Sequence, residues 1–165
     1  MRPLEWNQSH AAFVTEIDDE HQEIFKALSD LREALDAGSP VEHLRQVSRH
    51  LAACTVAHFA HEERLMRASH YHAKDWHKQQ HDHVRMRLAQ LAPRVEHGDA
   101  EAGTELAEYL TAWLHDHTRL TDRMLGAFLR NHRRGLCTLK FRAGTKAANA
   151  CNWVRASGER FDPAR

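Results

Sequence analysis

Histidine is the residue type whose number and spacing point most directly to chemistry in this chain. There are 15 histidines among 165 residues, and the imidazole side chain is both a common ligand of transition metals and a proton carrier near neutral pH. Two pairs lie at a spacing of four: His58 and Glu62 in HFAHEERLM, and His77 and His81 in HKQQH. Since residues four apart share a helical face, each pair can bind one ion if its segment is helical.

Hydrophobic periodicity predicts four helices around these pairs. Apolar residues recur at spacings of three and four through residues 18–37, 40–67, 73–92 and 101–130. We expect Pro93 to end or kink the third helix. Four amphipathic helices with short connections predict an all-α fold, an up-down-up-down four-helix bundle, with an irregular helical array as the alternative.

Histidines occupy the predicted inward faces of all four helices. A buried imidazole needs a hydrogen-bond partner or a metal ion. One such histidine is ordinarily a hydrogen-bonded core residue, but a set spread over four helices is most simply satisfied by a shared metal centre. The inward histidines are His21, His58, His77, His81 and His117.

The second predicted helix divides its polar residues between two faces. Glu62 shares the face of His58, whereas Glu63 lies about 140° around the helix axis from His58. We therefore expect Glu62 to point inward, Glu63 to point outward and His61 to be exposed at the flank. Cys54 is expected to be a small buried apolar residue. Apart from His72 in the loop after the second predicted helix, the remaining histidines are predicted to be surface residues: His10, His43, His50, His61, His70, His83, His97, His115 and His132.

Four stretches of the sequence together resemble the hemerythrin family, specifically single-domain bacterial hemerythrins. The stretches are IDDEH (17–21), HFAHEERLM (58–66), HKQQH (77–81) and WLHDHTRLTD (113–122), in the family's order and on the four predicted helices. The resemblance covers roughly residues 4–130. It implies a centre of two iron ions joined by an oxo or hydroxo bridge inside the bundle.

The resemblance also implies a division of the ligands between the two iron ions. By resemblance, His77, His81 and His117 bind the first iron, His21 and His58 bind the second, and Glu62 and Asp122 bridge the two. One coordination position is then left open on the second iron. Asp122 is included through the resemblance alone, because it lies five residues from His117 and spacing does not prefer it to Asp116.

An open position on a histidine-rich di-iron centre predicts reversible dioxygen binding, for storage, delivery or scavenging, and not an enzyme. By resemblance, Phe59, Trp113 and Leu114 surround the open position and exclude water. Thr118 stands where the family usually has an apolar residue, so its hydroxyl is expected to donate to a bound ligand or to admit water. The alternatives are a di-iron enzyme acting on peroxide, nitric oxide or ferrous iron, and a sensor of dioxygen or redox state.

Charge divides the chain into two expected parts. The 23 Lys and Arg balance 23 Asp and Glu, which gives no overall reason to expect nucleic acid or a membrane as partner. Residues 131–165 hold eight basic and two acidic residues, a net charge of +6. We predict a bundle domain at 1–130 and a basic extension at 131–165. The extension is expected to be disordered or loosely docked, with a short helical turn near 146–154. A solvated tail is favoured, and an unidentified partner for its charge is the alternative.

Two further expectations concern location and cysteine chemistry. The sequence contains no apolar run of about 20 residues, and its N-terminus lacks the apolar region of a signal peptide, so a cytoplasmic location is expected. The three cysteines show no CxxC spacing. They therefore suggest neither a disulfide framework nor a zinc knuckle.

Overall fold

The computed structural model describes the backbone of residues 5–142 and the side chains of residues 5–133. Contacts divide the chain into one unit of residues 1–128 and a second of residues 129–165. The described elements, in chain order, are η1 (Gln8–His10), α1 (Thr15–Asp36), α2 (Val41–Ala68), α3 (Lys74–Glu96), α4 (Ala100–Asp116), η2 (His117–Asp122) and α5 (Arg123–Arg142).

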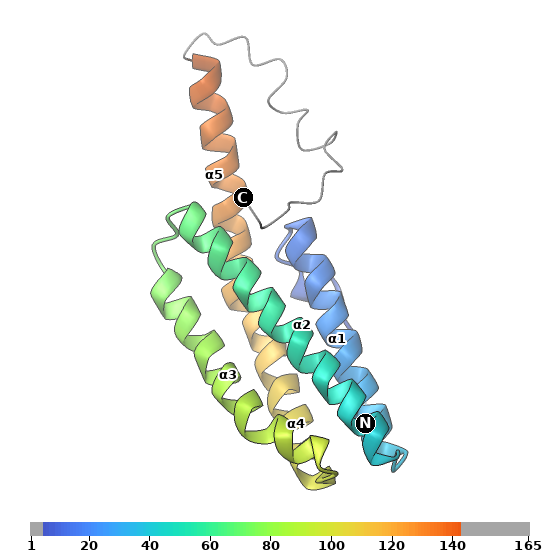
Figure 1. The fold of residues 1–165 in the computed structure, drawn as a ribbon. Helices are drawn as coiled ribbons and strands as arrows, with labels where there is room; N and C mark the ends of the chain where they lie inside the picture. Colours follow the sequence, from blue (N-terminus) through green and yellow to red (C-terminus); the bar gives the residue numbers. More distant parts are fainter. Residues whose placement is uncertain (1–4, 143–165) are drawn as a thin grey trace, which may run out of the picture. The chain divides into compact units, whose positions relative to one another are not determined.

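Helices α1 to α4 form the predicted up-down-up-down bundle (Figure 1). Short connections at 37–40, 69–73 and 97–99 force each helix to run back along its predecessor. Helix α1 packs against α2 and α4, and α3 packs against the same two helices. The side chain of Asp99 accepts a hydrogen bond from the N–H of Ala102 and so caps the start of α4. The predicted fold class is confirmed.

Alternating helix direction separates an apolar half of the bundle from a polar half. The early parts of α1 and α3 lie at the same end as the late parts of α2 and α4, and these four parts carry the predicted metal ligands. At the opposite end, leucine side chains fill most of the core, with Ser48 as a buried polar residue among them. The leucines with no exposed surface in that half are Leu28, Leu31, Leu51, Leu91 and Leu106.

Helix ends differ from the prediction in two places. Helix α3 continues through Pro93 to Glu96, with the exposed Pro93 in its last turn, where the missing N–H removes one helical hydrogen bond. The fourth predicted helix, 101–130, is instead α4, the π-helical segment η2 and α5. Helix α5 extends to Arg142, past the predicted start of an irregular extension at 131. The helical turn predicted near 146–154 lies outside the described residues.

The N-terminal segment before α1 folds onto the bundle and buries a histidine that we predicted at the surface. In η1, the N–H of Asn7 donates to Nδ1 of His10 at 3.2 Å. The His10 ring lies 4.7 Å from that of Phe25, centre to centre, and His10 is 4% exposed. A Cβ atom on Gly126 would lie 2.1 Å from the carbonyl oxygen of Ala12, so glycine is what lets the segment approach α5.

Candidate metal centre

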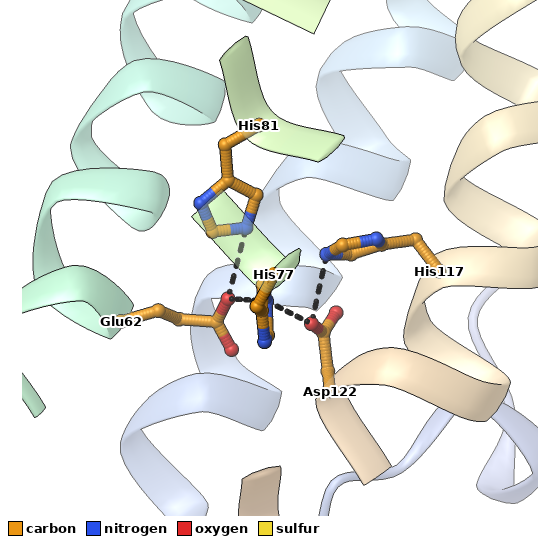
Figure 2. A group of neighbouring side chains, drawn as sticks. All are labelled: Glu62, His77, His81, His117 and Asp122. Atoms are coloured by element: carbon orange, nitrogen blue, oxygen red, sulfur yellow. Dashed lines mark hydrogen bonds and ion pairs between the residues drawn. The ribbon is translucent and has the colours of Figure 1, made fainter. Parts of the chain in front are cut away.

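All seven side chains predicted as metal ligands converge in the polar half of the bundle. Each is 3% exposed or less. Their donor atoms form two groups, each with atoms within 4.8 Å of one another. Figure 2 shows the larger group, with side chains from α2, α3 and the α4–η2 segment pointing toward one another. The larger group is Glu62, His77, His81, His117 and Asp122, and the smaller is His21, His58, Glu62 and Asp122.

The two carboxylates stand between the histidines and belong to both groups. Nε2 of His77 lies 3.1 Å from Oε2 of Glu62 and 3.2 Å from Oδ1 of Asp122. Nε2 of His81 lies 3.3 Å from Glu62, and Nε2 of His117 lies 3.0 Å from Asp122. On the other side, Nε2 of His21 lies 3.1 Å from Oδ2 of Asp122. Nε2 of His58 lies 3.7 Å from Oε2 of Glu62, so every inward histidine turns Nε2 toward a shared carboxylate.

The π-helical segment η2 explains why Asp122 reaches the site. In a regular α-helix, residues five apart lie about 140° from each other, so His117 and Asp122 would not point the same way. Segment η2 runs from His117 to Asp122, and the wider π turn brings residues five apart onto one face. Asp116, which spacing left as an equal candidate, is exposed. Only the local winding of the helix distinguishes the two aspartates.

Three of the histidines are held from behind by an acceptor. Nδ1 of His58 donates to Glu20 at 2.9 Å, and Nδ1 of His117 donates to the side-chain oxygen of Gln80 at 3.1 Å. Nδ1 of His81 lies 3.3 Å from Glu63. A donor at Nδ1 leaves the lone pair of neutral imidazole on Nε2, the nitrogen that faces the carboxylates.

Two residues assigned to the outside by the helical-face argument belong to this supporting layer. His61 is only partly exposed, and its Nδ1 donates to Glu20 at 2.6 Å. Glu63 is largely buried and also accepts from Arg85 at 2.8 Å. The predictions of an exposed His61 and an outward Glu63 are wrong, because neighbouring helices cover the flank of α2 that an isolated helix leaves to solvent.

Burial and charge act in opposite directions on the site's ionisation. Burial alone would lower the pKa of His77, but the carboxylates of Asp122 and Glu62 outweigh it and raise that pKa to about 9. Burial would raise the pKa of Asp122, yet imidazoles led by His117 bring it well below its usual range. For His117 itself, burial prevails and lowers the pKa. Without a metal, the site therefore pairs anionic carboxylates with a protonated His77.

Comparison with known proteins agrees with this arrangement. Residues 12–129 match the family model described as the hemerythrin HHE cation binding domain. The chain belongs to the hemerythrin family. It is 30% identical over 122 residues to bacteriohemerythrin of Pseudomonas aeruginosa, a match that covers 74% of this chain and 78% of the relative. It is 28% identical over 120 residues to myohemerythrin-1 of Phascolopsis gouldii, covering 73% of this chain and 89% of that one.

Among the residues predicted to line the hemerythrin ligand pocket, two aromatic side chains lie against the histidines. Phe59 stacks on His81, with ring centres 4.0 Å apart, and lies 5.9 Å from the ring of His58. Trp113 stacks on His117 at 4.1 Å. Their closest ring contacts are thus with the three-histidine group. Phe59 is fully buried, so it keeps water from the α2–α3 side of the site.

The other two predicted pocket residues, Leu114 and Thr118, lie one turn apart and are both buried. The Thr118 hydroxyl donates to the carbonyl oxygen of Leu114 at 2.9 Å. That hydrogen bond engages the only proton of the hydroxyl. The Thr118 hydroxyl is therefore bonded to its own helix, and this geometry disfavours the expected donation to a bound ligand.

A surface groove approaches the site from the side of α3 and α4. It has a volume of about 480 Å³, and Trp113 and His117 form part of its wall. The exposed side chains of Trp76 and Leu120 line the same groove. The stacked pair of Trp113 and His117 therefore separates the groove from the buried carboxylates.

Among the described residues, no helix is long and apolar enough to cross a membrane.

Proposed function

We propose that this chain binds dioxygen reversibly at a centre of two iron ions held by the seven converging side chains. One observation carries the proposal: two groups of metal ligands share the same two buried carboxylates, Glu62 and Asp122. Two adjacent ions bridged by carboxylates need this arrangement, whereas a single ion would leave one group without a role.

Buried polar atoms of the site that lack hydrogen-bond partners also support a bound metal. Buried polar atoms normally find a hydrogen-bond partner. Several atoms of the site make no hydrogen bond of acceptable geometry, although carboxylates and imidazoles lie close to them. Among them are His21 Nε2, His81 Nε2, His117 Nε2, Glu62 Oε1 and both carboxylate oxygens of Asp122, and Nδ1 of His21 and of His77 also lack a partner. Metal ions between these atoms would supply the missing partners.

The unequal histidine count supports ligand binding at one ion. The group of His77, His81 and His117 offers three imidazoles, and that of His21 and His58 offers two. The second ion would therefore have the freer coordination position. A ferrous pair with such a position supplies electrons and a bond for reversible dioxygen binding. Neutral imidazole ligands suit iron in this role.

The protein's own contribution is orientation and exclusion of water. Glu20 and Gln80 hold the Nδ1 atoms of His58 and His117, which fixes both rings with Nε2 toward the carboxylates. Phe59, stacked on His81, closes the α2–α3 side. The Thr118 hydroxyl donates to the carbonyl oxygen of Leu114, so it has no free proton to give a bound substrate, which weakens the enzymatic alternative.

The test is an optical experiment on iron-loaded, reduced protein. A visible charge-transfer band should appear in air, disappear under argon and return over repeated cycles. His21→Ala should abolish the reversible change, because it removes one of only two histidines from the second ion. His43→Ala, an exposed histidine outside the site, is the matched control. Irreversible oxidation within one cycle of the unmodified protein would overturn the proposal.

A further inference from the structure

A second cluster of metal-ligating side chains lies where α1 and α2 meet, outside the buried site. It consists of Glu23 on α1 and His50 and Cys54 on α2. One donor atom from each residue lies within 4.8 Å of the other two. None of the three residues belongs to either ligand group of the core, so the cluster is a candidate site separate from the core centre.

The distance between His50 and Cys54 fits a shared tetrahedral ion. Sγ of Cys54 lies 3.7 Å from Nδ1 and 3.7 Å from Nε2 of His50. With a Zn–S bond of about 2.3 Å and a Zn–N bond of about 2.0 Å, a tetrahedral angle separates the two ligand atoms by about 3.5 Å. The helical spacing of four thus places sulfur and imidazole at the separation that such an ion requires.

The cluster is also open to solvent, as a site that takes up an ion must be. His50 and Glu23 are exposed, and Cys54 is partly buried, which corrects the expectation of a buried apolar residue. Burial, followed by the negative charge of Glu23, raises the pKa of the Cys54 thiol to about 11. The free thiol is therefore protonated at neutral pH, and a bound cation would displace that proton to solvent.

We propose that Glu23, His50 and Cys54 bind a divalent ion of the zinc class at the surface of α1 and α2. The three side chains supply a carboxylate, an imidazole and a thiolate, and water completes the coordination. The thiolate distinguishes this site from the core centre, whose ligands are imidazoles and carboxylates only. A borderline soft ion such as Zn²⁺ is the expected occupant.

Cobalt titration, recorded as a difference from the iron-loaded protein before cobalt is added, tests this site separately from the core. Co²⁺ replaces Zn²⁺ in tetrahedral sites and gives a near-ultraviolet charge-transfer band only when a thiolate is bound. The full chain is loaded with iron and desalted, and Cys137 and Cys151 are replaced by serine so that Cys54 is the remaining thiol. The expected result is a band that saturates at one Co²⁺ per chain and is abolished by added Zn²⁺, which binds more tightly than Co²⁺.

Single substitutions then decide whether the three residues act together. Cys54→Ser should abolish the band. His50→Ala and Glu23→Gln should each weaken cobalt binding at least about tenfold, since even outer partners of metal ligands are worth that much. His43→Ala, an exposed histidine on the same helix, should leave binding unchanged. Since His50 is exposed, its variant should keep the fold, which circular dichroism checks.

Two results would overturn the proposal. One is the absence of a new charge-transfer band when cobalt is added to the iron-loaded protein. The other is a band that His50→Ala leaves at full strength, since the thiolate would then bind cobalt without the imidazole.

Discussion

Helix α2 carries two pairs of metal-binding side chains at the same spacing, His50 with Cys54 and His58 with Glu62, yet the two pairs lie in different surroundings. Four residues turn an α-helix by about 400°, so each step of four drifts by about 40° around the axis. His50 is exposed, Cys54 is partly buried, and His58 and Glu62 are buried. The same row of side chains thus winds from solvent into the core.

That difference shows how burial changes the significance of a ligand cluster. Water can satisfy the exposed pair at His50, so the surface cluster is stable with or without an ion. The buried oxygens of Asp122 have no such substitute and lack hydrogen-bond partners in the described structure. The core centre should therefore depend on its metal far more strongly than the surface cluster does.

Removing a shared carboxylate should have the largest effect. Glu62→Gln replaces an anion that belongs to both core groups with a neutral amide. Both iron ions should be lost, together with the visible spectrum, as measured by metal analysis per chain. Glu23→Gln, the matching change in the surface cluster, should leave the iron content unchanged. Normal iron content in the Glu62→Gln protein would refute the shared-bridge arrangement.

Metal removal should reveal the difference in stability. A ligand present at 1,000 times its dissociation constant stabilises the folded state by about 4 kcal/mol. Reduction and chelation of the iron should therefore lower Tm by on the order of 10 °C in a chain of this size. Removing zinc from the surface cluster should lower Tm by much less. Scanning calorimetry measures both changes, and an unchanged Tm after iron removal would contradict the expected dependence of the core on metal.

The residues that hold the core histidines from behind should make a smaller but measurable contribution to metal affinity. Gln80→Ala removes the acceptor for Nδ1 of His117. Loss of such an outer partner should weaken metal retention by about 10- to 100-fold, measured by competition with a chelator. The neighbouring exposed Gln79→Ala is the control. Equal retention in the two variants would mean that Gln80 does not orient the ring.

The pH dependence of metal uptake should differ between the two sites. In the metal-free core, His77 holds a proton with a pKa of about 9, and metal must displace it. Apparent affinity should therefore rise about tenfold per pH unit and level off near pH 9. At the surface cluster, the Cys54 thiol has a pKa of about 11, so affinity should keep rising past that point. Zinc titrations at several pH values measure both trends, and a common plateau would contradict them.

The raised pKa of His77 should also make the stability of the metal-free protein depend on pH. The folded-state pKa of His77 lies above its ordinary value of 6.5. Its ion pairs therefore contribute stability that is complete below about pH 6.5 and is lost as pH rises through about 9. Urea unfolding of metal-free protein should show this decline. His77→Gln should reduce it, leaving the part that comes from His58, whose pKa Glu62 also raises.

Prediction from the sequence succeeded where one helix decides the outcome. The inward positions of His58 and Glu62 follow from the apolar stripe of α2, and both are buried. It failed for His61 and His10, whose burial depends on Glu20 and on the fold of the N-terminal segment. The cluster at Cys54 was also missed, although the spacing of His50 and Cys54 was available as a signal.

The sequence by itself determined the helical class, the four-helix architecture and the five histidines that face inward. It could do so because covalent geometry sets the rotation per residue, and that rotation decides which residues share a face. Only the tertiary structure decided that a π segment turns Asp122 toward His117 and that α1 brings Glu23 beside Cys54. Local winding and the register between helices arise from packing against neighbours, which no single helical pattern contains.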